Sequence, residues 1–213
     1  RALVVFGHGP CFCAGLDLSE HRAREPAEVF HHSRSWHAAF SVLRRGRVPA
    51  IAALHGATVG GGLELAAACH LRVADPTAFF ALPEGSRGIY VGGGASVHVA
   101  RLLGAPRMMD MMLTGRVLDA AAAERAGLVQ YLMPEGAAPD KAAELAAKVA
   151  EMAPLTVLGV LQALPRIQDM GEDDGLFVES MMAALAQTGP EAAERLADFV
   201  AKRGAKVSGP AGS

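Results

Sequence analysis

The hydrophobic pattern divides the chain into a mixed first part and a helical last part. Short apolar runs bounded by glycine, proline or aspartate predict buried strands at residues 3–6, 50–54, 71–74, 78–82 and 128–133. Apolar residues at helical spacing predict helices at residues 26–45, 63–69, 95–103, 106–113 and 120–126. After Pro134 only helices are predicted, at residues 141–152, 155–167, 175–187 and 191–203. We expect the glycine-rich tail at residues 207–213 to be disordered.

Alternating strands and helices followed by helices alone predict an α/β core that carries a helical extension. We place the core at residues 1–150 and the extension at residues 151–213. A chain of 213 residues can bury a sufficient core without a metal or a disulfide. Because a buried strand is an unusual start for a domain, we also expect further residues upstream of Arg1.

Composition and charge narrow the classes of partner and location. The chain has 20 Lys and Arg against 22 Asp and Glu, a net charge of −2, which argues against a nucleic-acid partner. Its 51% hydrophobic content argues against long-range disorder, and no apolar run reaches the ~18 residues of a membrane-spanning helix. The three cysteines are too few for a disulfide framework. With no signal-peptide pattern at the start, they indicate a cytoplasmic protein.

Several short motifs have a simpler explanation than a functional one. Residues 7–9 follow a strand as in a dinucleotide-binding loop, but Phe12 occupies the place of the last required glycine. Ser96 and His98 nearly form a nucleophile elbow, whose last glycine and leading strand are missing. Neither the histidines at 31, 32 and 37 nor the cysteines at 11 and 13 have the spacing of a metal site. We therefore expect neither a nucleotide cofactor nor a metal.

A triple glycine at residues 60–62 opens the predicted helix that carries Glu64. Glycine lets a ligand approach the backbone closely, and the free N–H groups of a helix N-terminus attract an anion or a developing oxyanion. Glu64 would stand beside that anion site. Considered alone, Glu64 is better explained as a carboxylate that caps its own helix.

A second carboxylate, Glu84, ends a predicted buried strand and precedes glycines at 85, 88 and 92–94. A carboxylate in this place is a candidate acid or base, although alone it could be an exposed loop charge. Two glutamates, a helix start built from glycine and a second glycine-rich loop together predict an acid–base site with a backbone oxyanion hole.

Several separated motifs, in order and over essentially the whole chain, resemble the enoyl-CoA hydratase/isomerase (crotonase) family. The order makes the resemblance more specific than any single motif. The matching stretches are residues 1–18 (strand plus F-C/S-A-G-x-D-L), 49–64 (P-x-I-A-A-x-x-G-x-x-x-G-G-G-x-E-L), 80–84 (F-x-x-P-E), 113–115 with 123–129 (L-T-G … A-x-x-x-G-L-V) and 191–206 (terminal helix with F-x-x-K-R).

The resemblance implies a ββα spiral core, an acyl-CoA thioester substrate and no separate cofactor, because coenzyme A is part of the substrate. Carried over to this chain, the backbone N–H groups of Leu16 and Gly61 would form the oxyanion hole, and the N–H of Gly92 would help to hold a water molecule. The implied substrate contacts are Cys13, Ala14, Asp17, Leu18, Gly60, Tyr90 and Gly92.

The presence of both glutamates is typical of the hydratases of this family, since its double-bond isomerases keep only the one at position 84. The resemblance thus implies an enoyl-CoA hydratase in which Glu64 activates water and Glu84 handles the proton at the α-carbon. Burial would favour a protonated Glu84. The alternatives are isomerisation, hydroxyacyl-CoA cleavage, decarboxylation, or a non-catalytic acyl-CoA-binding subunit. Val91 replaces a frequent proline and residues 94–98 depart from the family pattern, so the acyl preference could differ.

The C-terminal helices of the family pack into trimers, often paired as hexamers, so we expect a homotrimer or hexamer. The apolar surface of residues 155–199 also predicts an oligomer. Relatives usually carry roughly fifty residues before the point that corresponds to Arg1, which fits the expectation of upstream sequence.

Overall fold

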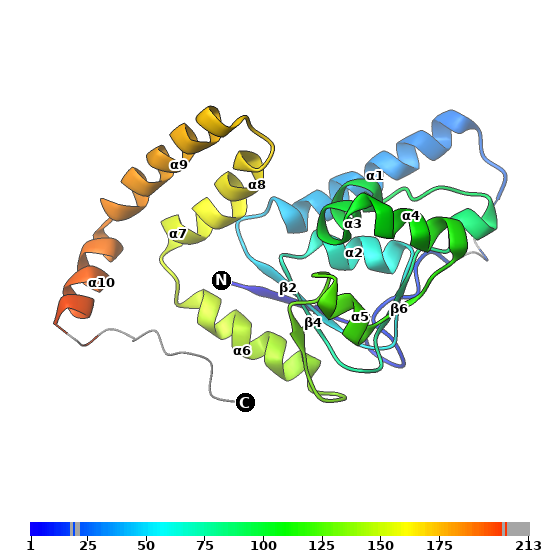
Figure 1. Ribbon diagram of the computed structural model, residues 1–213, viewed down its shortest axis with the longest axis horizontal. Coiled ribbons are helices and arrows are strands. Elements are labelled where there is room, and N and C mark those ends of the chain that lie inside the picture. Colours follow the sequence, from blue (N-terminus) through cyan, green and yellow to red (C-terminus); the bar gives the residue numbers. More distant parts are fainter. Residues whose placement is uncertain (18, 20–21, 202, 204–213) are drawn as a thin grey trace. The chain divides into compact units, whose positions relative to one another are not determined.

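The computed structural model describes residues 1–17, 19, 22–201 and 203 (Figure 1). Leu18 and the predicted tail at residues 207–213 lie outside the described residues. The chain divides into two compact units, Arg1–Ala150 and Glu151–Ser213, and each is considered by itself.

The first unit contains two small sheets. The first sheet has the order β1-β2-β4-β7, with all pairs parallel, and Leu3 lies opposite Ala50. The second has the order β3-β5-β6, in which the β3–β5 pair is parallel and the β5–β6 pair antiparallel. The strands are β1 (Leu3–Phe6), β2 (Ala50–Leu54), β3 (Ala57–Val59), β4 (Leu71–Ala74), β5 (Phe79–Ala81), β6 (Leu118–Asp119) and β7 (Tyr131–Leu132).

The chain winds through these sheets as a spiral. It passes along β2 and β3, turns into α2 (Gly61–Ala68), and returns along β4 and β5, so that each turn adds one strand to each sheet. This arrangement confirms the expected α/β class and the ββα spiral. The strand predicted at residues 128–133 is shorter than expected, because the N–H groups of Leu128 and Val129 bond to the carbonyl of Ala123 and close the preceding helix.

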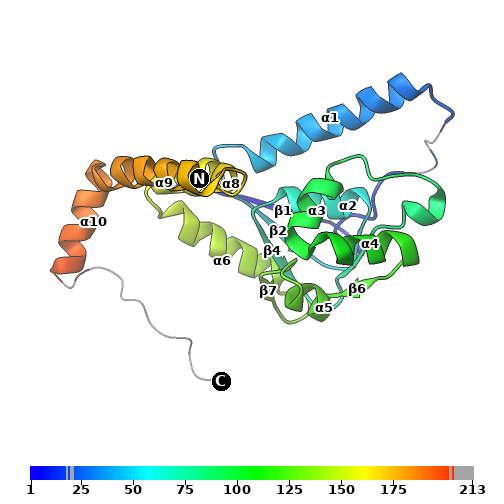
Figure 2. The same ribbon diagram turned by 45° about the horizontal axis from the view of Figure 1, so that its top comes forward.

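Helices cover both faces of the first sheet, because the side chains of a strand alternate between its faces. Ala50, Ala52 and Leu54 of β2 point into the larger core, which contains residues of α2 and of the helices that follow it. Ile51 and Ala53 point the other way, against Ala142 and its neighbours on α6 (Figures 1 and 2). The helices after β5 are η2 (Gly85–Arg87, 3₁₀), α3 (Ala95–Leu103), α4 (Ala105–Thr114), α5 (Ala120–Arg125) and α6 (Ala138–Ala150).

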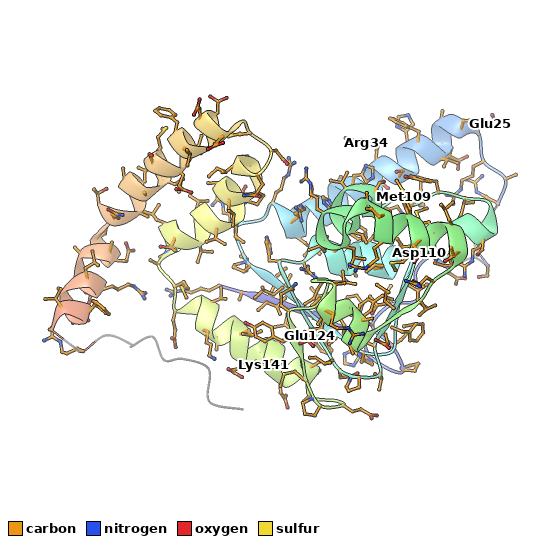
Figure 3. The ribbon with its side chains drawn as sticks, in the orientation of Figure 1. Glu25, Arg34, Met109, Asp110, Glu124 and Lys141 are labelled. Carbon is orange, nitrogen blue, oxygen red and sulfur yellow. The ribbon has the colours of Figure 1, made fainter. Side chains whose placement is uncertain are left out.

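The long helix α1 (Pro26–Arg44) places Phe40 in the interior and keeps much of its length exposed. Glu25, at its N-cap position, and Arg34 are both exposed (Figure 3). Because only a narrow face of α1 is covered, the few residues on that face make its contacts with the rest of the unit.

A buried arginine joins three parts of the first unit. Arg72 of β4 is 3% exposed, and its guanidinium donates to the carbonyl oxygens of Leu128 at 2.6 Å and Cys69 at 2.7 Å. It also donates to the Gln130 side chain at 3.1 Å. Burial lowers the pKa of Arg72 to about 10. The side chain thus supplies donors to buried main-chain carbonyl groups.

The second unit consists of helices. The segment predicted as one helix at residues 155–167 is α7 (Pro154–Leu158), the π-helical η3 (Gly159–Ala163) and α8 (Leu164–Ile167) in succession. It is followed by α9 (Glu172–Gln187) and α10 (Pro190–Val200). In the described part of the chain, none of the helices combines the length and the apolar character that crossing a bilayer requires.

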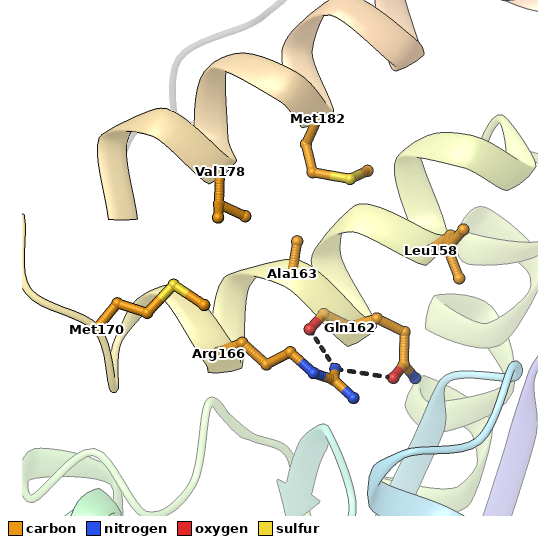
Figure 4. Close-up of a pocket in the computed structure, with 7 residues that line it drawn as sticks. All are labelled: Leu158, Gln162, Ala163, Arg166, Met170, Val178 and Met182. Atoms are coloured by element: carbon orange, nitrogen blue, oxygen red, sulfur yellow. Dashed lines mark hydrogen bonds between the residues drawn. The ribbon is translucent and has the colours of Figure 1, made fainter. Parts of the chain in front are cut away.

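A hollow of about 290 Å³ lies within the second unit, between η3 with α8 and the facing side of α9 (Figure 4). Val178 and Met182 line it from α9, and Arg166 donates to Gln162 at its opposite side. Its lining includes no carboxylate, histidine or cysteine, and therefore no acid–base pair.

Candidate functional site

Two backbone N–H groups meet at the glycine-built start of α2. Gly61 is the first residue of that helix, and among the described residues its N–H donates to no acceptor, nor does the N–H of Leu16. An ideal Cβ built on Gly61 would be 3.9 Å from the Leu16 nitrogen, and one on Gly15 would be 3.4 Å from the Gly61 nitrogen. The structure thus brings together the two N–H groups expected for the oxyanion hole.

Close backbone contact holds the loop before Leu16 in place. The N–H of Cys13 donates to Ala57 at 3.0 Å, and its carbonyl accepts from Val59 at 3.1 Å. A Cβ on Gly62 would be 2.0 Å from the Cys13 oxygen, so only glycine allows this approach. Ala14 follows directly in the same loop. The pairing to β3, which the sequence pattern did not predict, is what places the loop beside α2.

The end of this loop is open to solvent. Leu16 is 53% exposed, although its backbone nitrogen lies near Gly61. The Asp17 carboxylate accepts a hydrogen bond from the Ser19 N–H at 2.9 Å, and the hydrogen bonds from Ser19 lower its pKa.

Glu64 is buried in the first turn of α2, and its carboxylate accepts hydrogen bonds at the start of another helix. Its Oε1 accepts the N–H of Gly93 at 2.7 Å and the N–H of Ala95, the first residue of α3, at 3.0 Å. Among the described residues, both hydrogen bonds of its side chain go to N–H groups outside its own helix. Glu64 therefore has the position of an anion at the N-terminus of α3, which fixes its carboxylate between two helix starts.

Phe40 and Ser33 of α1 complete the surroundings of this carboxylate, and neither was predicted as a site residue from the sequence. A Cβ on Gly93 would be 2.5 Å from Glu64 Oε2 and 2.9 Å from Phe40 Cε2. The Ser33 hydroxyl donates to the carbonyl of Gly92 at 2.6 Å. The seven-residue spacing of Ser33 and Phe40 places them on one face of α1, but no local pattern shows that this face meets the glycines 59 residues downstream.

Glu84 stands on the other side of the α2 start and is 8% exposed, so the interpretation as an exposed loop charge is wrong. A Cβ on Gly60, which has φ +55°, would be 2.8 Å from Glu84 Oε1. Among the described residues, the buried Glu84 Oε2 has no hydrogen-bond partner. Burial raises the pKa of Glu84, and the negative charge of Glu64 raises it further.

The remaining predicted residues lie around this centre with different exposure. Gly92 is partly buried beside Ser33, whereas Tyr90 is 70% exposed. Ser96 is exposed at the start of α3. Burial and neighbouring positive charges, Arg44 first, lower the pKa of His98 to about 4. The described residues contain no cluster of three or more His, Cys, Asp or Glu that could hold a metal ion.

Comparison with known proteins gives a consistent answer. The sequence profile of the enoyl-CoA hydratase/isomerase family matches residues 1–209. The probable enoyl-CoA hydratase 2, mitochondrial, of Arabidopsis thaliana is 37% identical over 192 residues, which are 90% of this chain and 64% of the plant protein. The chain thus spans just under two thirds of the length of that curated relative.

Solved structures agree in fold. A provisionally named enoyl-CoA hydratase from Rhodopseudomonas palustris CGA009 is 54% identical with a TM-score of 0.93, over 95% of this chain and 79% of that one. The enoyl-CoA hydratase from Bacillus anthracis is 30% identical with a TM-score of 0.88, over 95% and 79% of the two chains. Sequence profile, relatives and fold lead to one conclusion: this chain belongs to the enoyl-CoA hydratase/isomerase family.

Proposed function

We propose that the protein adds water across the 2,3-double bond of a 2-enoyl-CoA and releases a 3-hydroxyacyl-CoA. The observation that carries the proposal is the pair of buried glutamates on the two sides of the α2 start, next to two backbone N–H groups that have no acceptor among the described residues. This grouping supports the proposal, because water addition to a conjugated thioester requires an acid, a base and oxyanion donors close together.

In this proposal the N–H groups of Leu16 and Gly61 bind the thioester oxygen. Attack of water on the β-carbon shifts electrons toward that oxygen, which becomes enolate-like. Donors that are already in position stabilise the developing charge without reorganisation, and one such donor is typically worth about 3–4 kcal/mol. Because main-chain atoms supply the donors, the exposed side chain of Leu16 is free to vary.

The two glutamates divide the proton transfers. Glu64 Oε1 is held by two N–H groups, so Oε2 takes a proton from water as its oxygen bonds to the β-carbon. The raised pKa of Glu84 makes it the acid that gives a proton to the α-carbon. Exchange with solvent then returns Glu84 to its protonated state and Glu64 to its carboxylate. The N–H of Gly92 helps to hold the water.

The substrate contacts remain a proposal carried over from the family. They comprise Cys13, Ala14, Asp17, Leu18, Gly60, Tyr90 and Gly92. Hydration moves no electrons to or from a carrier, so the proposal includes no cofactor, and coenzyme A enters as part of the substrate. Assembly as a homotrimer or hexamer and a cytoplasmic location stay predictions, the first to be tested by sedimentation.

The test is the hydration of crotonyl-CoA, followed as the loss of the conjugated thioester absorbance, by wild type, Glu64→Gln and Glu84→Gln. Glu124→Gln is the matched control, because Glu124 is exposed on α5 (Figure 3). We expect both site variants to lose at least about 100-fold in kcat and the control to match wild type. Loss at Glu84 alone, with conversion of a 3-enoyl-CoA, would instead indicate an isomerase. A folded wild type that binds CoA without turnover would indicate a non-catalytic acyl-CoA-binding subunit.

A further inference from the structure

The hydroxyl of Ser33 reaches out of its own helix. Serines in a helix commonly bond to a carbonyl one turn earlier. Two serines of α1 do so, Ser35 to His32 at 2.6 Å and Ser41 to Ala38 at 2.8 Å. Ser33 instead donates to Gly92, 59 residues away, at 2.6 Å.

The acceptor of this bond belongs to the peptide group that holds Glu64. The Gly92 carbonyl and the Gly93 N–H are the two ends of one planar trans peptide, so they point in opposite directions. Ser33 donates to one end, and the other end donates to Glu64 Oε1 at 2.7 Å. The three groups form a continuous chain from α1 to the carboxylate, and each bond in such a chain polarises the next.

This peptide lies where the backbone has little intrinsic restraint. Residues 92–94 are all glycine, and Gly94 adopts φ +113°. Glycine has more backbone conformations available than any other residue, so the peptide plane needs an outside contact to keep its orientation. Phe40, which lies on the same face of α1 as Ser33, is close to Gly93, but its side chain offers no hydrogen bond. Ser33 is the described side chain that bonds to this peptide on its carbonyl side.

We propose that Ser33 is a positioning residue for the hydration reaction: it orients the Gly92–Gly93 peptide, which in turn holds Glu64 in place to activate water. The inference rests on the proposed function. Ser33 itself does not touch the reacting atoms. Its loss leaves Glu64 present but loosely held, so the chemical step slows more than substrate binding weakens.

The experiment compares Ser33→Ala, Ser33→Cys, Ser33→Thr and the control Ser35→Ala in crotonyl-CoA hydration. Alanine and cysteine keep a side chain of similar size without a strong donor, whereas threonine keeps the hydroxyl. We expect kcat to fall about tenfold in the first two with KM within about twofold of wild type, and to recover to within about threefold in Ser33→Thr. Ser35→Ala should match wild type.

A spectroscopic readout separates this inference from the proposed function. In protein labelled with ¹⁵N-glycine, the Gly93 amide proton should move upfield in Ser33→Ala and stay in place in Ser35→Ala. An unshifted Gly93 resonance, or a Ser33→Ala variant with wild-type kcat and only a lower melting temperature, would overturn the inference. A shifted resonance in a protein without hydratase activity would overturn the catalytic proposal and, with it, the role of Ser33 in it, while the hydrogen-bond chain itself would stand.

Discussion

Replacing Gly93 by alanine tests whether the position of Glu64 controls activity. The new Cβ would be 2.5 Å from Glu64 Oε2 and 2.9 Å from Phe40 Cε2. Ordinary contacts begin near 3.4 Å, so the carboxylate must retreat by roughly 0.9 Å; displacements of this size cost about 100-fold in rate. We therefore expect kcat for hydration to fall about 100-fold.

The same clash has a cost in stability. Overpacking a buried site typically costs about 1–3 kcal/mol, and each kcal/mol lowers the melting temperature of a domain this size by about 2–4 °C. Gly92→Ala is the control for unfolding: its Cβ would meet Ser33 Oγ at 3.6 Å and Ser33 Cβ at 3.8 Å, both ordinary contacts, and neither glycine has a positive φ. We expect Gly92→Ala to melt within about 2 °C of wild type.

A second substitution separates the two contacts of the new methyl group. Phe40→Leu in the Gly93→Ala background relieves the contact with the ring but leaves the contact with Glu64. We expect the double variant to recover part of the lost melting temperature and little of the lost rate. Hydration by Gly93→Ala at the wild-type rate, measured as loss of enoyl-thioester absorbance, would refute the reasoning that this carboxylate must stay in place.

Three further changes test other parts of the first unit. Because the pKa of Glu84 is raised in the folded state, its contribution to stability is complete below the ordinary value of 4.5 and is lost as the pH rises through the folded-state pKa. Glu84→Gln should therefore have a higher melting temperature than wild type at pH 8 and not at pH 4. Arg72→Ala removes the guanidinium donor from two buried main-chain carbonyls and should cost about 2–4 kcal/mol in urea unfolding. Arg116→Ala, which breaks an exposed ion pair, should cost less than about 1 kcal/mol. Asp119→Ala removes the side-chain cap of α5, a bond of 2.7 Å, and should cost about 0.5–2 kcal/mol, so an unchanged unfolding midpoint would contradict its role as a cap.

The sequence was informative wherever a local pattern was long enough. The continuous apolar run at Ala50–Leu54 predicted the central strand, because a strand buried on both faces shows no alternation. Strands β3 and β6 have three and two residues, too few to show a period, and they form through pairing with β5, which is distant in the sequence pattern. The π-helical turn at Gly159–Ala163 likewise could not be predicted, because the apolar spacing there is that of one continuous helix.

The site shows the same division between local and distant information. Glu64 and Glu84 could be predicted because their residue type and glycine neighbours are local signals. Ser33 and Phe40 could not, because their meaning depends on which distant loop faces α1. The capping explanation for Glu64 was partly right in kind: the carboxylate does bind a helix start, but that of α3 rather than its own. Only the folded chain shows which of the two helix starts the Glu64 carboxylate binds.

The spiral also determines where the chain can change in length. Ile51 pairs with Leu71 in one sheet, while Ala57 pairs with Phe79 in the other, so the same stretch of chain fixes the register of both sheets. An inserted residue within β3 or α2 would shift every later strand against its partner and would carry Glu84 away from Gly60. Connections on the helical side bear no such double constraint, as between α9 and α10. Natural variation in length should therefore gather in those connections and spare residues 50–82.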